Sequence, residues 1–250
     1  MALMRTSNPA LNAQTFADVR RDPTAPAMTV EGTANKAAFL LFLVVVPAAW
    51  VWAQVRSAPG PAAAGPWILV GAIGGLVVAL VTIFKKEWSP VTAPLYAALE
   101  GLALGGVSAL LETKYPGIAM QSVGLTFATL AAMLLAYRSG LIKATEKFKL
   151  GVVAATGAIA LYYLVGLGLS FFGITTPFLQ GNSTASIVVS GIIVVVAALN
   201  LILDFDFIET GVAGGAPKYM EWYGAFGLMV TLIWLYLEIL RLLAKARSRR

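Results

Sequence analysis

The sequence predicts an all-α, polytopic membrane protein with seven transmembrane helices. Of its 250 residues, 59% are hydrophobic and only 12% are charged, whereas an average soluble domain has roughly 25% charged residues. The mean hydropathy of +0.81 agrees. A soluble fold of this length could not bury so much apolar surface, because the surface of a domain shrinks too slowly relative to its volume. In a bilayer the same surface faces lipid.

Seven apolar stretches are long enough to cross a membrane, since a helix needs about 20 mainly apolar residues to cross roughly 30 Å of hydrocarbon. The stretches are continuous rather than alternating, which favours helices over a β-barrel. Pro47 predicts a kink in the first, and the short link after the second predicts a helical hairpin. We predict spans at residues 37–55, 67–84, 91–111, 118–137, 150–172, 186–208 and 224–243.

Three regions follow from this pattern. Residues 1–35 are polar and interrupted by prolines, with no early apolar core, so we expect a mostly disordered arm and no cleavable signal peptide. Residues 36–244 form the transmembrane domain, and residues 245–250 form a basic tail. Gly101 and Gly105 form a G-x-x-x-G pattern, which favours close helix packing over a pore-lining role.

The distribution of Lys and Arg predicts the orientation. Counted with the N-terminus inside, the inner segments are rich in cations and the outer loops hold few, which places the N-terminus in the cytoplasm. The basic tail disagrees, because an odd number of spans puts it outside. Either the tail crosses despite its charge, or the last segment is re-entrant; we favour seven full spans and would map the accessibility of Lys245.

The composition excludes several kinds of chemistry. The chain has no Cys and no His, so disulfides, thiol catalysis, zinc sites built from Cys and His, and histidine proton switches are ruled out. The net charge of +6 reflects orientation signals rather than nucleic-acid binding. Proton or cation chemistry must rest on carboxylates, Lys, Arg, Tyr or the backbone.

Four carboxylates lie within or near the end of predicted spans: Glu100, Asp204, Asp206 and Glu238. An ionised carboxylate at the bilayer centre costs at least about 2.5–3.5 kcal/mol, so these residues are the informative ones. We expect Asp206 at the water interface. Glu100 has no cation within one turn of its own helix, so it must find a partner on another helix, carry a proton or face water.

Asp204 and Glu238 can form a pair if the sixth and seventh spans are antiparallel. Asn200, one turn before Asp204, extends a polar stripe on that helix. Equal depth requires the chain to reverse near residues 217–219. Two close carboxylates could share a proton, because both ionise with difficulty, and when charged they could hold Ca²⁺. Glu238 has an alternative partner in Arg241, three residues on.

Short motifs around these acids resemble those of the Bax inhibitor family, also called the transmembrane Bax inhibitor motif family, in its bacterial branch. The likeness covers roughly residues 37–243. Its motifs are residues 98–105 with Glu100, residues 203–208 with Asp204, and residues 235–240 with Glu238, and residues 7–12 (Ser-Asn-Pro-Ala-Leu-Asn) are similar to the start of a bacterial subgroup.

The resemblance implies a fold of six helices around a central seventh. It also implies a two-carboxylate sensor of a calcium leak on the last two helices, at Asp204 and Glu238. Here the second acid is Glu where the family has Asp, and the linker between the two motifs is longer than usual. Some bacterial relatives interact with a membrane protease.

We therefore expect a pH-sensitive cation leak, for Ca²⁺ above all, in the bacterial cytoplasmic membrane. Asp204 and Glu238 would form its gate on the cytoplasmic half, with Arg241 as a competing internal cation. Glu100, Asp206 and Asn200 would support the same interior. The expected partners are lipid and Ca²⁺ or H⁺, with no nucleic acid and no cofactor besides Ca²⁺.

Two other functions remain open. The chain could be a non-conducting regulator that binds a membrane protease or a stress-response partner through its polar arm. An intramembrane enzyme is the weaker alternative, since only Asp204 with a second acid could serve as an aspartyl protease-like pair. We expect no enzymatic activity.

Overall fold

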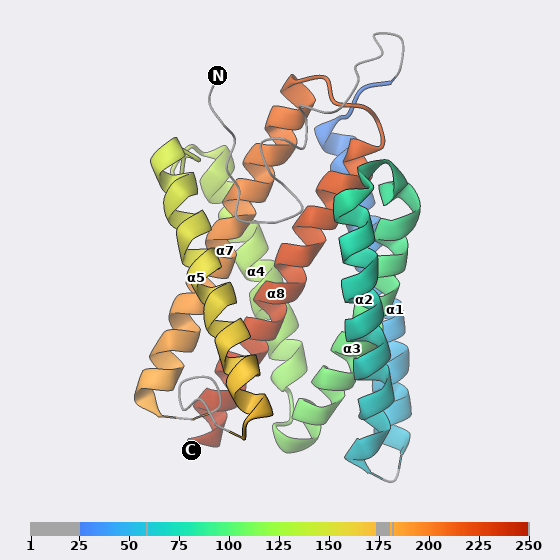
Figure 1. Ribbon diagram of the computed structural model, residues 1–250, viewed down its shortest axis with the longest axis vertical. Helices are drawn as coiled ribbons and strands as arrows, with labels where there is room; N and C mark the ends of the chain where they lie inside the picture. The colour runs from blue at the N-terminus through green and yellow to red at the C-terminus, as the bar shows by residue number, and fades with distance from the viewer. Residues whose placement is uncertain (1–25, 59, 174–180, 182, 250) are drawn as a thin grey trace.

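The computed structural model describes residues 26–58, 60–173, 181 and 183–249, and it contains seven helices long and apolar enough to cross a membrane (Figure 1). All seven predicted spans are confirmed. The helices are α1 (Val30–Ser57), α2 (Gly65–Phe84), α3 (Ser89–Lys114), α4 (Ile118–Arg138), α5 (Glu146–Phe171), α7 (Thr184–Ala213) and α8 (Met220–Ser248), with short 3₁₀ turns at Pro61–Ala64 and Lys86–Trp88.

The helices extend beyond the apolar runs because polar residues cap their first turns. The side chains of Thr29, Thr145 and Ser183 accept hydrogen bonds from backbone N–H groups at the starts of α1, α5 and α7. Two predicted boundaries shift, one at the start of α1, where Thr29 caps the helix, and one at the end of α8. Residues 30–35, expected in the arm, belong to α1, and residues 245–248, expected in the tail, belong to α8. The rest of the arm, apart from residues 26–29, lies outside the described residues.

Successive helices alternate in direction, so α1, α3, α5 and α8 run the same way (Figure 1). We call the end where α1 begins the N-terminal end of the bundle, and the end where α8 finishes the C-terminal end. The last segment is one continuous helix of 29 residues, which is long enough for a full crossing. Of the two possibilities for this segment, the structure has the full span and not the re-entrant loop.

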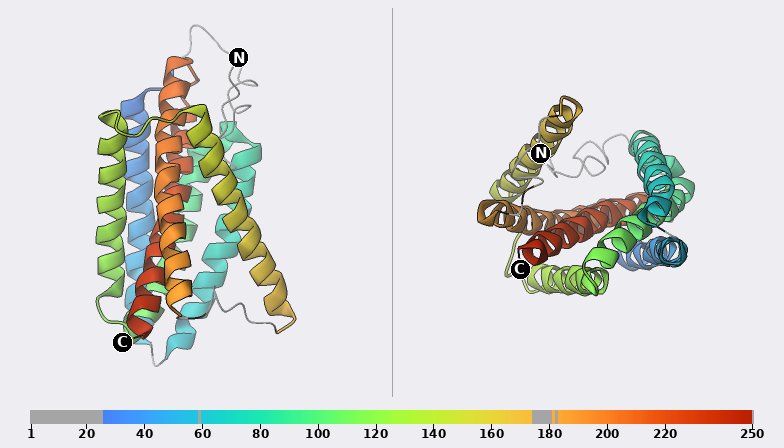
Figure 2. Two further views of the ribbon diagram at one scale, coloured as in Figure 1. Left: turned by 90° about the vertical axis from the view of Figure 1, so that its left-hand side faces the viewer. Right: turned by 90° about the horizontal axis from the view of Figure 1, so that it is seen from below.

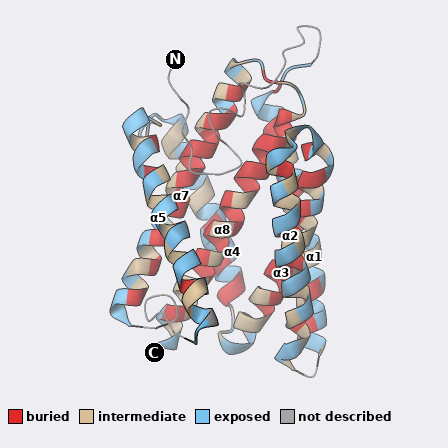
Figure 3. Ribbon diagram, viewed as in Figure 1, coloured by how far each residue is buried: buried red, intermediate tan, exposed pale blue. Residues whose placement is uncertain are grey.

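Helix α8 lies at the centre of the bundle, but α2 and α5 do not pack closely on it, so the arrangement of six helices around the last one is met only in part. Helix α8 packs against α1, α3, α4 and α7, and the view along the bundle shows it surrounded by them (Figure 2). Buried residues concentrate on α7 and α8 (Figure 3). Helix α2 covers the outer side of α3, whereas α5 packs mainly on α7 and leans away from the other helices (Figure 2).

Glycines bring the backbones of α1, α2 and α3 into contact. A Cβ atom on Gly105 would lie 2.5 Å from the carbonyl oxygen of Ala48, and one on Gly101 would collide with that of Val44. A Cβ on Gly71 of α2 would lie 2.5 Å from the carbonyl oxygen of Leu99. Real Cβ atoms do not approach so closely, so only glycine fits. The packing role predicted for Gly101 and Gly105 is confirmed.

Candidate functional site

Asp204 is completely buried on α7, and the contacts of α7 with α8 fix its depth. Near the N-terminal end, a Cβ on Gly224 of α8 would lie 3.3 Å from the side chain of Ile208. Near the C-terminal end, the Nζ of Lys245 donates hydrogen bonds to Ser186 and Ser190. Both contacts give one antiparallel register, in which the part of α8 opposite Asp204 lies close to residues 228–229.

Glu238 therefore lies about nine or ten residues farther along α8, which at about 1.5 Å per residue is roughly 14 Å. The structure does not bring Asp204 and Glu238 to one depth, because α7 continues to Ala213 and α8 begins at Met220. The chain thus reverses near residue 216, whereas equal depth of the two acids needs a reversal at their midpoint, residue 221, rather than at residues 217–219 as expected. One Ca²⁺ ion, with ligands at about 2.3–2.6 Å, would not reach both carboxylates in this register.

Glu238 is bound by Arg241 and by Tyr163 of α5. The Nη1 of Arg241 lies 3.0 and 3.1 Å from the two carboxylate oxygens, and the hydroxyl of Tyr163 donates to Oε1 at 2.8 Å. Arg241 also donates to the Tyr163 oxygen at 2.6 Å, with its guanidinium 5.1 Å from the centre of that ring. The local pair that the sequence offered for Glu238 is confirmed, and it neutralises a side chain that is only 2% exposed.

Nearer the N-terminal end, two of the supporting residues join α7 to α5. The amide nitrogen of Asn200 donates to the Thr156 hydroxyl at 2.9 Å. Asp206 forms an ion pair with Lys149 at 2.7 Å, and its side chain is 24% exposed. The interface position expected for Asp206 agrees with this partial exposure, but the residue is paired rather than simply solvated.

Polar side chains thus follow one another along the contact of α5, α7 and α8, and we call this set the polar interface. On α7 it runs from Asp206 to Ser186, twenty residues or about 30 Å, which is roughly the thickness of the hydrocarbon core. The charged and polar pairs hold three helices together along this length. The polar interface consists of Lys149, Thr156, Tyr163, Ser186, Ser190, Asn200, Asp204, Asp206, Glu238, Arg241 and Lys245.

Glu100 lies outside the polar interface. It is half-buried on α3, where its Oε1 would lie 2.6 Å from a Cβ atom on Gly75 of α2. Within the described part of the chain, no hydrogen bond or ion pair of Glu100 is found. The expectation that Glu100 lines the same interior as Asp204 and Glu238 is therefore not met, because the contact of α2 with α3 holds it on the other side of the bundle.

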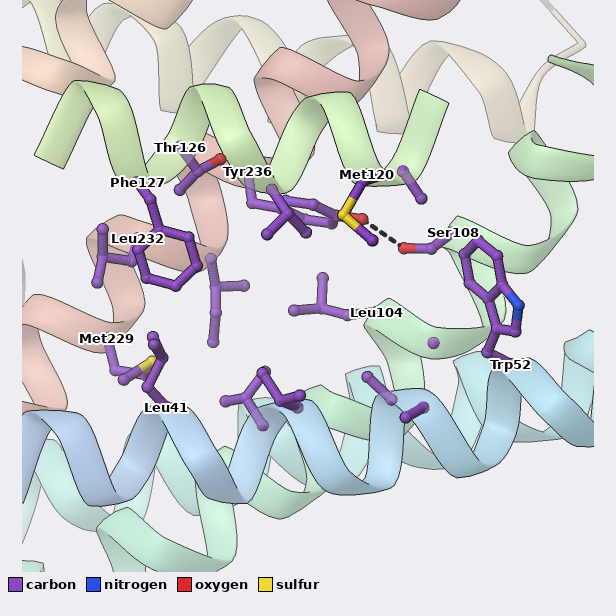
Figure 4. Close-up of a pocket in the computed structure, with 18 of the residues that line it drawn as sticks. Leu41, Trp52, Leu104, Ser108, Met120, Thr126, Phe127, Met229, Leu232 and Tyr236 are labelled. Carbon is purple, nitrogen blue, oxygen red and sulfur yellow. Dashed lines mark hydrogen bonds between the residues drawn. The ribbon is translucent and has the colours of Figure 1, made fainter. Parts of the chain in front are cut away.

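A second feature is an apolar cavity of about 540 Å³ between α1, α3, α4 and α8 (Figure 4). A hydrogen bond of 2.6 Å between Ser108 and Tyr236 crosses its wall. Glu112, at its edge, accepts bonds from the backbone N–H groups of Gly117 and Ala119 at the start of α4. The cavity is separate from the polar interface. Among the described residues, no group of three or more acidic side chains could hold a metal ion.

Sequence reasoning missed half of the polar interface. Two signals were available: Ser186 and Ser190 share a helix face with Asn200 and Asp204, and Lys245 follows Arg241 by one turn. No such signal marked α5, since its threonine and tyrosines stand in an otherwise apolar run that resembles a lipid-facing span. The residues missed are Lys149, Thr156, Tyr163, Ser186, Ser190 and Lys245.

Comparison with known proteins gives one family. The sequence profile of the family described as Bax inhibitor 1 like matches residues 8–248, nearly the whole chain. No curated protein and no solved structure gives a significant match. The match includes α1–α8 and all three acidic motifs. With seven membrane-spanning helices, of which α8 lies at the centre, the chain is an integral membrane protein that belongs to the Bax inhibitor 1 like family.

Proposed function

We propose that the protein is a cation leak pathway, for Ca²⁺ above all, that uses the polar interface of α5, α7 and α8. The supporting observation is the length of this interface, which matches the hydrocarbon thickness while carrying buried carboxylates at two depths. A charge in a bilayer is costly, and polar groups spaced across the hydrocarbon lower that cost for a crossing ion. The bacterial cytoplasmic membrane is the proposed location.

In this proposal Asp204 and Glu238 are two successive binding positions along the cation path rather than one two-carboxylate site. A cation entering from the N-terminal end would pass the ion pair of Asp206 with Lys149 and then reach Asp204, with the Asn200 amide one turn deeper. Arg241 closes the path at Glu238, because its guanidinium already occupies the position that a passing cation would take. Protonation of Asp204 would remove its attraction for a cation, so that flux would depend on pH.

Flux of Ca²⁺ in proteoliposomes, measured across pH with an encapsulated indicator, tests the proposal. Asp204→Asn mimics the protonated acid, so its flux should stay near the acidic-pH level of the wild type at every pH. Arg241→Met should raise flux, and Glu238→Gln should lower it. Glu209→Gln is the matched control, since Glu209 is an exposed acid on α7 that only accepts a bond from Tyr137. Unchanged flux and pH profile in the three interface variants would reject the polar interface as the path, and no flux in the wild type would reject the leak.

The proposed orientation has the N-terminal end of the bundle in the cytoplasm, because that end carries Lys85, Lys86, Arg138, Lys143 and Lys147. Lys245 is a poor reporter for this point, since it is buried and bonded to serines. Arg249 is exposed, and Arg249→Cys gives the chain its single thiol. An impermeant maleimide should label it from outside the cell; labelling only after lysis would reverse the assignment.

A further inference from the structure

Glu221, at the first turn of α8, has no exposed surface and four hydrogen-bond donors. Its Oε1 accepts from the backbone N–H and the hydroxyl of Thr29, both at 2.9 Å, and pairs with Lys218 at 2.9 Å. Its Oε2 pairs with Lys36. Three of these contacts fall on Oε1 and one on Oε2, so both oxygens of the carboxylate are bound.

These bonds join segments that are far apart in the sequence. Thr29 and Lys36 flank the start of α1, whereas Glu221 and Lys218 flank the start of α8, and Thr29 is also the residue that caps α1. The backbone adds an antiparallel bridge between Ala27 and Pro217 and a bond from the N–H of Met28 to the oxygen of Ala216. Glu221 thus holds the chain that enters the membrane against the helix at the centre of the bundle.

The space around Glu221 is closed on the α1 side by Gly32. A Cβ atom there would collide with the Glu221 carboxylate, so any larger residue must push the carboxylate away. The side chains of Lys36 and Lys218 extend toward the surface, since they are 20% and 53% exposed. The contact of Glu221 with the start of α1 therefore lies at the edge of the bundle. A partner that binds residues 27–36 could separate them from α8 there.

We propose that Glu221 is a latch: it clamps residues 27–36 to the start of α8, and its release lets α8 shift within the bundle. Because α8 is one continuous helix that also carries Glu238, Arg241 and Lys245, a shift at Glu221 reaches the polar interface. The latch itself stands independently of ion conduction, and only its effect on flux rests on the proposed function.

The chain has no cysteine, so disulfide trapping can test the latch directly. Residues opposite each other in an antiparallel pair have Cα atoms about 4.5–5.5 Å apart, within the roughly 4.4–6.8 Å that a disulfide spans. Ala27→Cys with Pro217→Cys should cross-link quickly in membranes. Adding Glu221→Gln should slow cross-linking roughly tenfold, since one lost bond to a charged group changes a population by about that factor. Equal cross-linking rates would overturn the latch.

Movement of α8 needs its own reporter. Thr231 is buried on α8, and Thr231→Cys removes one methyl group and replaces the hydroxyl by a thiol. A small permeant maleimide should label it slowly in the wild-type background and several-fold faster with Glu221→Gln. Gly32→Ala should act in the same way without changing any charge, and it serves if the Gln variant does not fold. Gly124→Ala is the matched control, because a Cβ at Gly124 meets nothing within 4 Å.

Flux separates the two proposals. If the latch regulates conduction, Glu221→Gln should raise flux. The disulfide between residues 27 and 217 should lower flux until a reductant is added. Slower cross-linking and faster Thr231→Cys labelling with no flux in any variant would reject the leak and keep the latch. Slower cross-linking with unchanged labelling would overturn the coupling to α8.

Discussion

The contact of α1, α2 and α3 differs in kind from the contact of α5, α7 and α8. In the first region, backbones touch through glycines such as Gly101 and Gly105. In the second, the glycines Gly157, Gly168 and Gly191 have nothing within 4 Å of a Cβ position, and polar side chains make the contacts. Backbone contacts have one close fit, whereas side-chain pairs can exchange partners. The first region therefore acts as a frame, and the second is the part suited to change shape.

The largest expected effect tests the polar region. Arg241→Met leaves the buried Glu238 with the Tyr163 hydroxyl but no cation, and breaking a buried pair in this way costs about 3–5 kcal/mol. We expect the lower end, because the Arg241 side chain is 41% exposed. Thermal unfolding in detergent measures the loss. The double variant with Glu238→Gln should recover most of it, and no recovery would show that Arg241 acts by packing alone.

The frame should show the next largest effect. Gly101→Ala and Gly105→Ala each force a Cβ atom against a carbonyl oxygen of α1, and overpacking of this kind costs about 1–3 kcal/mol. The expected outcome is a lower midpoint of thermal unfolding for both variants. Midpoints equal to the wild type would mean that α1 can move away from α3 freely, and the two regions would no longer differ.

An effect of similar size concerns Lys245. Ser186→Ala with Ser190→Ala removes two acceptors from a buried ammonium group, which should cost about 1–3 kcal/mol. Lys245→Met removes the charge as well, so it should cost less than the serine double variant. Unfolding midpoints of the two proteins, compared in one detergent, check the order. The opposite order would mean that lysine packing outweighs its hydrogen bonds.

The smallest effect is the control for the frame. Gly157→Ala and Gly168→Ala add a methyl group where α5 has open space, so stability should change little or rise by up to about 1 kcal/mol from helix propensity. A drop as large as that of Gly105→Ala would show that α5 packs as closely as α3 in the membrane.

Some of the candidate site could be predicted because its interactions are local. Glu238 and Arg241 are three residues apart on one helix, and Asn200 and Asp204 share a face by helical spacing alone. The bonds from Tyr163 to Glu238 and from Thr156 to Asn200 could not be predicted, because nothing in α5 shows which of its faces meets α7. Lys218 is a local partner of Glu221, but the link to α1 could not be predicted, since Thr29 and Lys36 lie near the other end of the sequence.

The sequence alone determined that seven helices cross a membrane, since an apolar segment in lipid must satisfy its backbone hydrogen bonds within itself. That requirement is local and can be read from each segment separately. Only the tertiary structure decided how far apart Asp204 and Glu238 lie and that Lys149 of α5 pairs with Asp206. Those distances depend on the register of α7 against α8, which the packing of side chains across the whole bundle sets.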